Sequence, residues 1–168
     1  MLTPSLDLET DFAQEVLMGT AYETDIVAWA NEQAALLRAG KLDQIDIEHI
    51  SDEVEDVGKS EQRELSHRMA VLLSHLLKWK YQPEWRGASW QSTIRTQRIA
   101  IETRLQKTPG LKSSINDSSW WADPWADAVY DFAKETGIDI ELPDSCPWTF
   151  DQVMDQQWKP QETKMPRG

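Results

Sequence analysis

The sequence predicts an all-α fold, a single-domain helical bundle of about four main helices with a short C-terminal helix. Apolar residues recur at helical spacing in several long segments, no stretch alternates polar and apolar residues over a useful strand length, and no fixed-period repeat is present. The chain has 168 residues, a length typical of one domain. We expect that domain to cover residues 21–158, with an N-terminal extension over 1–20 and a frayed tail over 159–168.

The first two helices are predicted over residues 23–39 and 46–78. Gly40 follows the first, where a left-handed residue commonly ends a helix, and Asp46 is placed to cap the second. The second helix begins with apolar residues three, four and three positions apart, a coiled-coil-like spacing: Ile47, Ile50, Val54 and Val57. Gly58 and Ser60 then indicate either a bend or a break, and Pro83 ends the segment.

The third helix is predicted from about residue 89 to 107, where Thr108-Pro109-Gly110 stops it. Three basic residues lie at or beyond the margins of its apolar stripe: Arg95, Arg98 and Arg104. A fourth helix is expected with Asp123 as N-cap, Pro124 as its first residue and Gly137 at its end. A final short helix should begin after Thr149, which forms a capping-box pattern with Gln152.

Charge is distributed in blocks along the chain. There are 17 basic and 29 acidic residues, a net charge of -12, and residues 1–57 hold 14 acids but 2 bases. Residues 78–112 hold 8 bases and 2 acids. Opposite blocks most simply pair within the domain or with a second copy of the chain. This basic stretch, interleaved with aromatic residues, resembles a nucleic-acid-binding strip, but the net charge opposes approach to phosphates.

The cysteine content and the N-terminal sequence bound the class of protein further. Cys146 alone excludes an internal disulfide and a multi-cysteine zinc site. The first residues contain no basic residue and no apolar run, so no secretory leader is visible, and no apolar stretch is long enough to span a membrane. We therefore expect a cytoplasmic protein with no membrane association.

Nine tryptophans are spread along the predicted helices, which indicates that most of them join helices together. Trp85 and the Trp120-Trp121 pair are the candidates for an exposed aromatic patch.

Polar residues lie beside the apolar face of the second predicted helix. Glu61, Arg68 and His75 are seven positions apart, and Glu64 lies one turn before Arg68. Arg98 is the expected partner of Glu61 or Glu64. The set is interpreted first as an internal ion-pair network that fixes helix register, with a binding or catalytic site and an intermolecular seam as alternatives.

No catalytic residue, metal site or cofactor is predicted. Glu64 and His67 have the E-x-x-H spacing of di-iron bundles, but the motif occurs once and His67 points away from the apolar face. No G-x-S-x-G, phosphate loop or dinucleotide fingerprint is present.

Several segments resemble, in order, a bacterial family called domain of unknown function 29. They are Tyr22-Glu23-Thr24-Asp25, Gln33-Ala34-Ala35-Leu36-Leu37-Arg38-Ala39-Gly40, Arg63-Glu64-Leu65, His75-Leu76-Leu77-Lys78-Trp79, Tyr81-Gln82-Pro83 and Pro147-Trp148-Thr149. The resemblance covers roughly residues 22–158 and implies a compact helical bacterial protein, without supplying an activity. His67, Trp85 and the region around Trp120-Trp121 depart from the family pattern.

We therefore expect a non-enzymatic protein-interaction module that self-associates or binds another protein. Its candidate interaction surface consists of Trp85, Arg95, Arg104, Trp120 and Trp121. The alternatives are a small metal-assisted hydrolase and a nucleic-acid-binding regulator. The hydrolase would use Glu61, Glu64 and His75, with Arg98 holding an anion.

Overall fold

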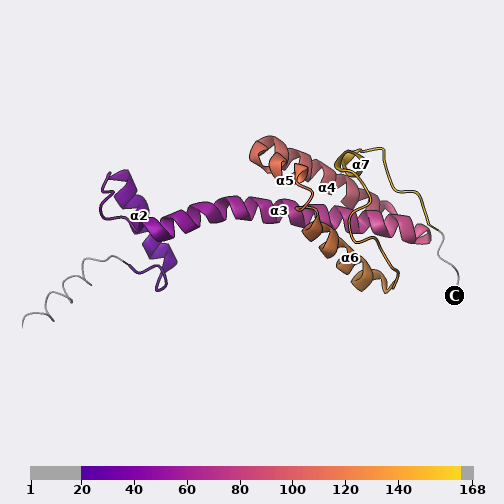
Figure 1. Ribbon diagram of the computed structural model, residues 1–168, viewed down its shortest axis with the longest axis horizontal. Helices are drawn as coiled ribbons and strands as arrows, with labels where there is room; N and C mark the ends of the chain where they lie inside the picture. The colour runs from indigo at the N-terminus through magenta and orange to yellow at the C-terminus, as the bar shows by residue number, and fades with distance from the viewer. Residues whose placement is uncertain (1–19, 164–168) are drawn as a thin grey trace, which may run out of the picture. The chain divides into compact units, whose positions relative to one another are not determined.

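The computed structural model describes residues 20–163 and confirms the all-α class, since these residues contain no strand (Figure 1). The helices in chain order are α2 (Ile26–Arg38), α3 (Ile47–Tyr81), the 3-10 turn η1 (Pro83–Trp85), α4 (Ala88–Lys107), the 3-10 turn η2 (Pro109–Leu111), α5 (Lys112–Asn116), α6 (Ala122–Thr136) and α7 (Phe150–Met154). The chain divides into two compact units at the boundary between Val57 and Gly58. We call residues 20–57 the N-terminal unit and residues 58–163 the C-terminal unit.

The N-terminal unit consists of α2 and the first turns of α3. Asp25 caps α2, because its Oδ1 accepts hydrogen bonds from the amides of Val27 and Ala28 at 3.0 Å each. Asp46 caps α3 in the same way, accepting from the amide of His49 at 3.3 Å, as the sequence predicts. Gly40 has a φ of 69° and turns the chain after α2.

Helix α3 continues through Gly58, so neither Gly58 nor Ser60 breaks it. Its end at Tyr81 lies two residues before Pro83, which the sequence marks as the stop. Nothing lies within 4 Å of the position that a Cβ on Gly58 would occupy, and its φ is not positive. The glycine therefore lowers helix propensity at this point without stopping the helix.

The C-terminal unit contains the hydrophobic core. Figure 1 shows α4, α6 and α7 gathered around the second half of α3. The buried core residues are Leu65, Met69, Leu72, Leu73, Leu76, Leu77, Ile94, Ile101, Leu105, Leu111, Ile115, Trp125, Ala128, Phe132 and Val153. The apolar face of the second half of α3 is thus the centre of this unit.

The start of α6 differs from the prediction. The helix begins at Ala122 with Trp121 as its N-cap, so Asp123 lies inside the first turn and does not cap it. A turn held by Asp117, whose carboxylate accepts from both the amide and the hydroxyl of Ser119, leads directly into the helix. Pro124 is tolerated there because the first amides of a helix have no intrahelical acceptor. Gly137, with a φ of 68°, ends α6 as predicted.

The C-terminal end of the described chain is attached to the core. The capping box of α7 is confirmed, with Thr149 and Gln152 bonding each other's backbone amides. Pro160 is buried, and the amide of Thr163 donates to the carbonyl of Lys80 at 2.9 Å. Residues 160 and 163 of the tail predicted over 159–168 thus have contacts with the rest of the C-terminal unit. Residues 164–168 of that tail and residues 1–19 of the predicted extension lie outside the described part. Within residues 20–163, no helix combines the length and apolarity needed to cross a membrane.

Candidate functional site

Three residues of the predicted polar set, Glu61, Glu64 and Arg68, lie in a group of ion pairs whose central cation is Arg104 and not Arg98. Arg104 Nη1 donates to Glu61 Oε2, and Arg104 Nη2 lies 3.6 Å from Glu64 Oε1. Glu64 Oε1 also accepts from Arg68 Nη2 at 2.7 Å. Arg68 reaches α4 as well, since its Nη1 donates to Gln97 Oε1 at 3.4 Å. This arrangement links α3 to α4.

Arg98 has different partners from those expected. Its side chain is buried, with 1% of the residue exposed, and does not contact Glu61 or Glu64. Nε donates to the carbonyl of Val153 at 2.7 Å and Nη2 to the carbonyl of Trp158 at 2.8 Å. Burial lowers the pKa of Arg98, partly offset by the charge of Asp155. The sequence predicts Arg98 at the margin of the apolar stripe of α4. It is buried instead, because the segment that contains Val153 and Trp158 covers that side of the helix.

His75 does not join the carboxylates of the network. Its Nδ1 is 2.9 Å from the carbonyl of Val71, and it lies eleven positions after Glu64, about 16 Å along the helix axis. Burial lowers the pKa of His75, and the charged groups near it are Lys78 and Glu135. Within residues 20–163, no three acidic, histidine or cysteine side chains converge in a way that would hold a metal ion. The residues assigned to the hydrolase alternative are therefore not assembled at one point.

Much of the basic stretch is occupied by contacts inside the C-terminal unit. Lys78 is almost fully buried, donates to Glu135 Oε2 and lies 5.9 Å from the ring centroid of Trp90. Arg86 donates to the carbonyl of Trp79 at 2.8 Å and pairs with Glu162 at 3.3 Å. Arg95 and Lys107 remain exposed.

The tryptophans of the predicted interaction surface have different environments. Trp85 is exposed and lines a cavity of about 520 Å³ together with Lys78 and Trp90. Trp120 and Trp121 are partly buried against the core, and Trp121 Nε1 donates to the carbonyl of Ile115 at 2.9 Å. Trp120 lines a separate cavity of about 610 Å³, so these residues do not form one aromatic patch.

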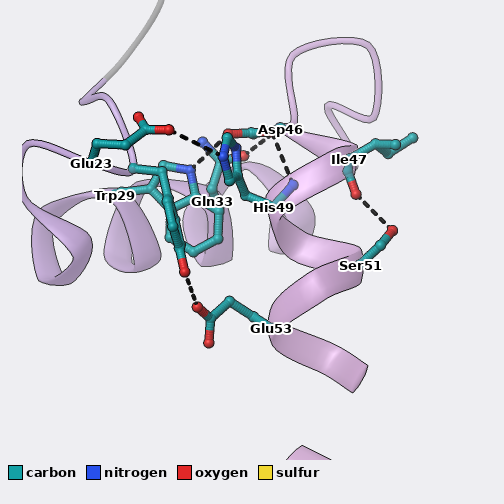
Figure 2. Close-up of polar contacts among 9 residues, drawn as sticks. Glu23, Trp29, Gln33, Asp46, Ile47, His49, Ser51 and Glu53 are labelled. Carbon is teal, nitrogen blue, oxygen red and sulfur yellow. Dashed lines mark hydrogen bonds and ion pairs between the residues drawn. The ribbon is translucent and has the colours of Figure 1, made fainter. Parts of the chain in front are cut away.

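A second polar cluster lies in the N-terminal unit, where the sequence predicts no site (Figure 2). Trp29 Nε1 donates to Asp46 Oδ2 at 3.1 Å, and Gln33 Oε1 accepts from the amide of Asp46 at 2.7 Å. Both Trp29 and Gln33 are buried and come from α2. Asp46 therefore caps α3 and fixes α2 against it.

His49 completes this cluster one turn after Asp46. Its Nδ1 is 2.7 Å from Asp46 Oδ2 and its Nε2 is 3.4 Å from Glu23 Oε1, as Figure 2 shows. The imidazole stacks on the ring of Tyr22, with 4.3 Å between centroids and 17° between planes. Tyr22 in turn donates to Glu53 Oε1 at 2.5 Å. With an acceptor beside each nitrogen, the doubly protonated ring fits this position best.

The electrostatics of the cluster agree with this geometry. The hydrogen bond to Asp46 raises the pKa of His49. Burial works to raise the pKa of Asp46, but hydrogen bonds from His49 and Trp29 outweigh it and the pKa is lowered. The hydrogen bond to Glu53 raises the pKa of Tyr22. The cluster is thus a hydrogen-bonded clamp between α2 and α3. The three-residue spacing of Asp46 and His49 at the start of a predicted helix is the sequence signal for it.

Apolar side chains are exposed mainly in the N-terminal unit. Seven of the ten exposed large apolar residues of the described chain lie there: Ile26, Val27, Leu37, Leu42, Ile47, Val54 and Val57. Ile47, Val54 and Val57, with half-buried Ile50 between them, form what we call the apolar seam of α3. Their exposed fractions are 65%, 67% and 68%. The spacing that resembles a coiled-coil seam therefore faces solvent.

Comparison with known proteins identifies the family of the chain. The family model described as domain of unknown function DUF29 matches residues 21–159, which is most of the chain. No curated protein and no solved structure matches the chain. The match includes both units and agrees with the resemblance found in the sequence. The chain belongs to the DUF29 family.

Proposed function

We propose that this protein is a non-enzymatic interaction module that binds a protein partner through the apolar seam of α3. The observation that carries the proposal is the exposure of Ile47, Val54 and Val57 at the spacing used for helix–helix contacts. Contiguous exposed apolar residues are uncommon on monomeric proteins and mark interaction surfaces. The proposal includes the cytoplasmic location expected from the sequence and the bacterial setting implied by the family resemblance.

The composition of the N-terminal unit supports the proposal. Its helices bury Trp29 and Gln33, whereas seven large apolar side chains remain exposed. A unit of this size gains little stability from so small a core. The clamp of Asp46 and His49 holds α2 against α3, so the seam is presented on a positioned helix.

The other functions considered have less support from the side-chain contacts. The carboxylates Glu61 and Glu64 are engaged by Arg104, and His75 lies apart from them. Lys78, Arg86, Arg98 and Arg104 of the basic stretch all have acceptors within the C-terminal unit. These contacts favour structural roles for the residues on which the hydrolase and nucleic-acid alternatives depend.

Site-specific photo-crosslinking tests this proposal. A photoreactive amino acid is placed at Val54 in the seam and, as a matched control, at Tyr130, which has a similar exposure in the C-terminal unit. We expect a discrete adduct from position 54 in the producing cell, identified by mass spectrometry and reproduced with the purified partner. The adduct should disappear when Val57→Asp is added. Equal adducts from both positions, or none from position 54, would contradict the proposal.

A further inference from the structure

The apolar seam has the dimensions of one face of a helix. At about 100° per residue, Ile47, Ile50, Val54 and Val57 fall within about 80° of the helix circumference. From Ile47 to Val57 the seam extends over about 15 Å, or three turns. A partner helix with an apolar stripe of similar length is therefore the simplest complement to it.

The unit that carries the seam is strongly acidic. Residues 20–57 contain ten acidic residues and two basic ones. The clamp neutralises part of this charge, because Asp46 and Glu23 both contact His49. The two basic residues, Arg38 and Lys41, lie in the last turn of α2 and in the loop after it. The unit that carries the seam therefore has a net negative charge.

We infer that the seam binds a basic amphipathic helix of another protein, with its apolar stripe on Ile47, Val54 and Val57 and its lysines or arginines attracted by the negative charge of the N-terminal unit. This inference rests on the proposed function and adds the chemistry of the partner. Opposite charges around an apolar contact accelerate association and select the partner.

The charges also argue against two other occupants. Two copies of the seam would bring like charges together, which disfavours a homodimer at this surface. Residues 1–19 of the same chain contain four acidic residues and no basic ones, so they are repelled in the same way. In the basic stretch of a second copy, Lys78, Arg98 and Arg104 are engaged within their own unit, which leaves Arg95 and Lys107 exposed. Docking of that stretch on the seam is the outcome that protection lost on dilution would reveal.

A peptide titration of the full chain tests the inference. The probe is a fluorescently labelled 18-residue helical peptide with a leucine stripe and a lysine face, and binding is followed by anisotropy. One control peptide replaces every lysine with glutamate, and another has the same composition in an order without an apolar face. We expect the first peptide alone to bind, with an affinity that falls as salt is raised. The double variant Val54→Ser/Val57→Ser should bind about tenfold more weakly, whereas Ile99→Ser on α4 should bind normally.

The outcomes separate this inference from the proposed function. Equal binding of the glutamate peptide, equal binding of the scrambled peptide or an unaffected seam variant would each overturn the inference. No binding by any peptide would also overturn it, whereas the proposed function is decided by crosslinking at Val54.

Thiol labelling distinguishes the remaining occupants. Val54→Cys is compared with Val27→Cys on α2, which has a similar exposure, while the native Cys146 is half-buried and has a pKa raised by burial. Equally fast labelling of both is expected for an open seam. Protection of position 54 alone that is lost on dilution would indicate a second copy, and protection independent of concentration would indicate residues 1–19. Either result would overturn the inference.

Discussion

The guanidinium of Arg98 on α4 donates to the main-chain carbonyl of Trp158, 60 positions later in the chain, at 2.8 Å. The same side chain donates to the carbonyl of Val153 at 2.7 Å. These two bonds attach α7 and the segment after it to the core of the C-terminal unit. A buried arginine that satisfies backbone carbonyls therefore has a structural role, and the sequence alone had placed it at a stripe margin.

Replacing Arg98 with methionine should destabilise the C-terminal unit by about 2–4 kcal/mol, because two carbonyls lose their donors in a buried position. Arg98→Lys keeps the charge but not the planar guanidinium with its several donors. We therefore expect its free energy of unfolding to lie between those of Arg98→Met and the native protein. Urea unfolding measures the free energy, and limited proteolysis after residue 150 measures detachment of the C-terminal segment. Native stability in Arg98→Met would contradict this role.

The contacts of Arg104 with Glu61 and Glu64 should stabilise the packing of α4 on α3 by about 1 kcal/mol, since these side chains are partly exposed. A double-mutant cycle with Arg104→Met and Glu61→Gln measures the coupling energy directly. Added salt should reduce it. Arg95→Met, on an exposed residue of the same helix, serves as the control and should have little effect. Zero coupling in the cycle would exclude the ion pair as a stabilising contact.

Protonation of His49 should stabilise the N-terminal unit. The pKa of His49 is raised in the folded chain by Asp46, then by Glu23 and Glu48, while Tyr22 stacks on the ring. A raised folded pKa means that this contribution is fully present below about pH 6.5 and is lost as the pH rises through the folded value. NMR titration should show Asp46→Asn lowering the pKa of His49 and leaving that of His75 unchanged. A His49 pKa unaffected by Asp46→Asn would show that the clamp does not act as described.

Two glycines offer a matched test of backbone conformation. Neither Gly58 nor Gly137 has an atom within 4 Å of the position of an added Cβ, but Gly137 alone of the two has a positive φ. Gly58→Ala should therefore stabilise by about 0.5–1 kcal/mol, whereas Gly137→Ala should destabilise by about 1 kcal/mol. Thermal unfolding of both variants gives the comparison. Stabilisation by Gly137→Ala would contradict the left-handed end of α6, and loss of stability in Gly58→Ala would contradict a regular helix there.

The features that could be predicted from the sequence depend on neighbours along the chain. Gly40, Asp46, Gly137 and the Thr149-Gln152 pair act within one turn of themselves, so local spacing was enough to identify them. The apolar stripes of α3 and α4 also follow from helical periodicity alone. The start of α6 was predicted wrongly because the turn at Asp117 and Ser119 continues into the helix before Asp123 is reached.

The features that could not be predicted depend on contacts between distant segments. A helical wheel places Arg98 near the core, but its acceptors come from residues 153 and 158, which have no recognisable spacing to it. The exposure of the seam of α3 could not be predicted from the sequence either. The spacing of the seam predicts a contact with another helix, whereas its exposure depends on which side chains of the N-terminal unit pack against it.

Hydrogen exchange of the full chain, measured by mass spectrometry with and without the lysine-faced helical peptide, tests the docking surface most directly. We expect added protection confined to residues 47–57, and none in the Val54→Ser/Val57→Ser variant. Protection centred on α4 or α6, or protection that persists in that variant, would contradict the assignment of the apolar seam as the docking surface.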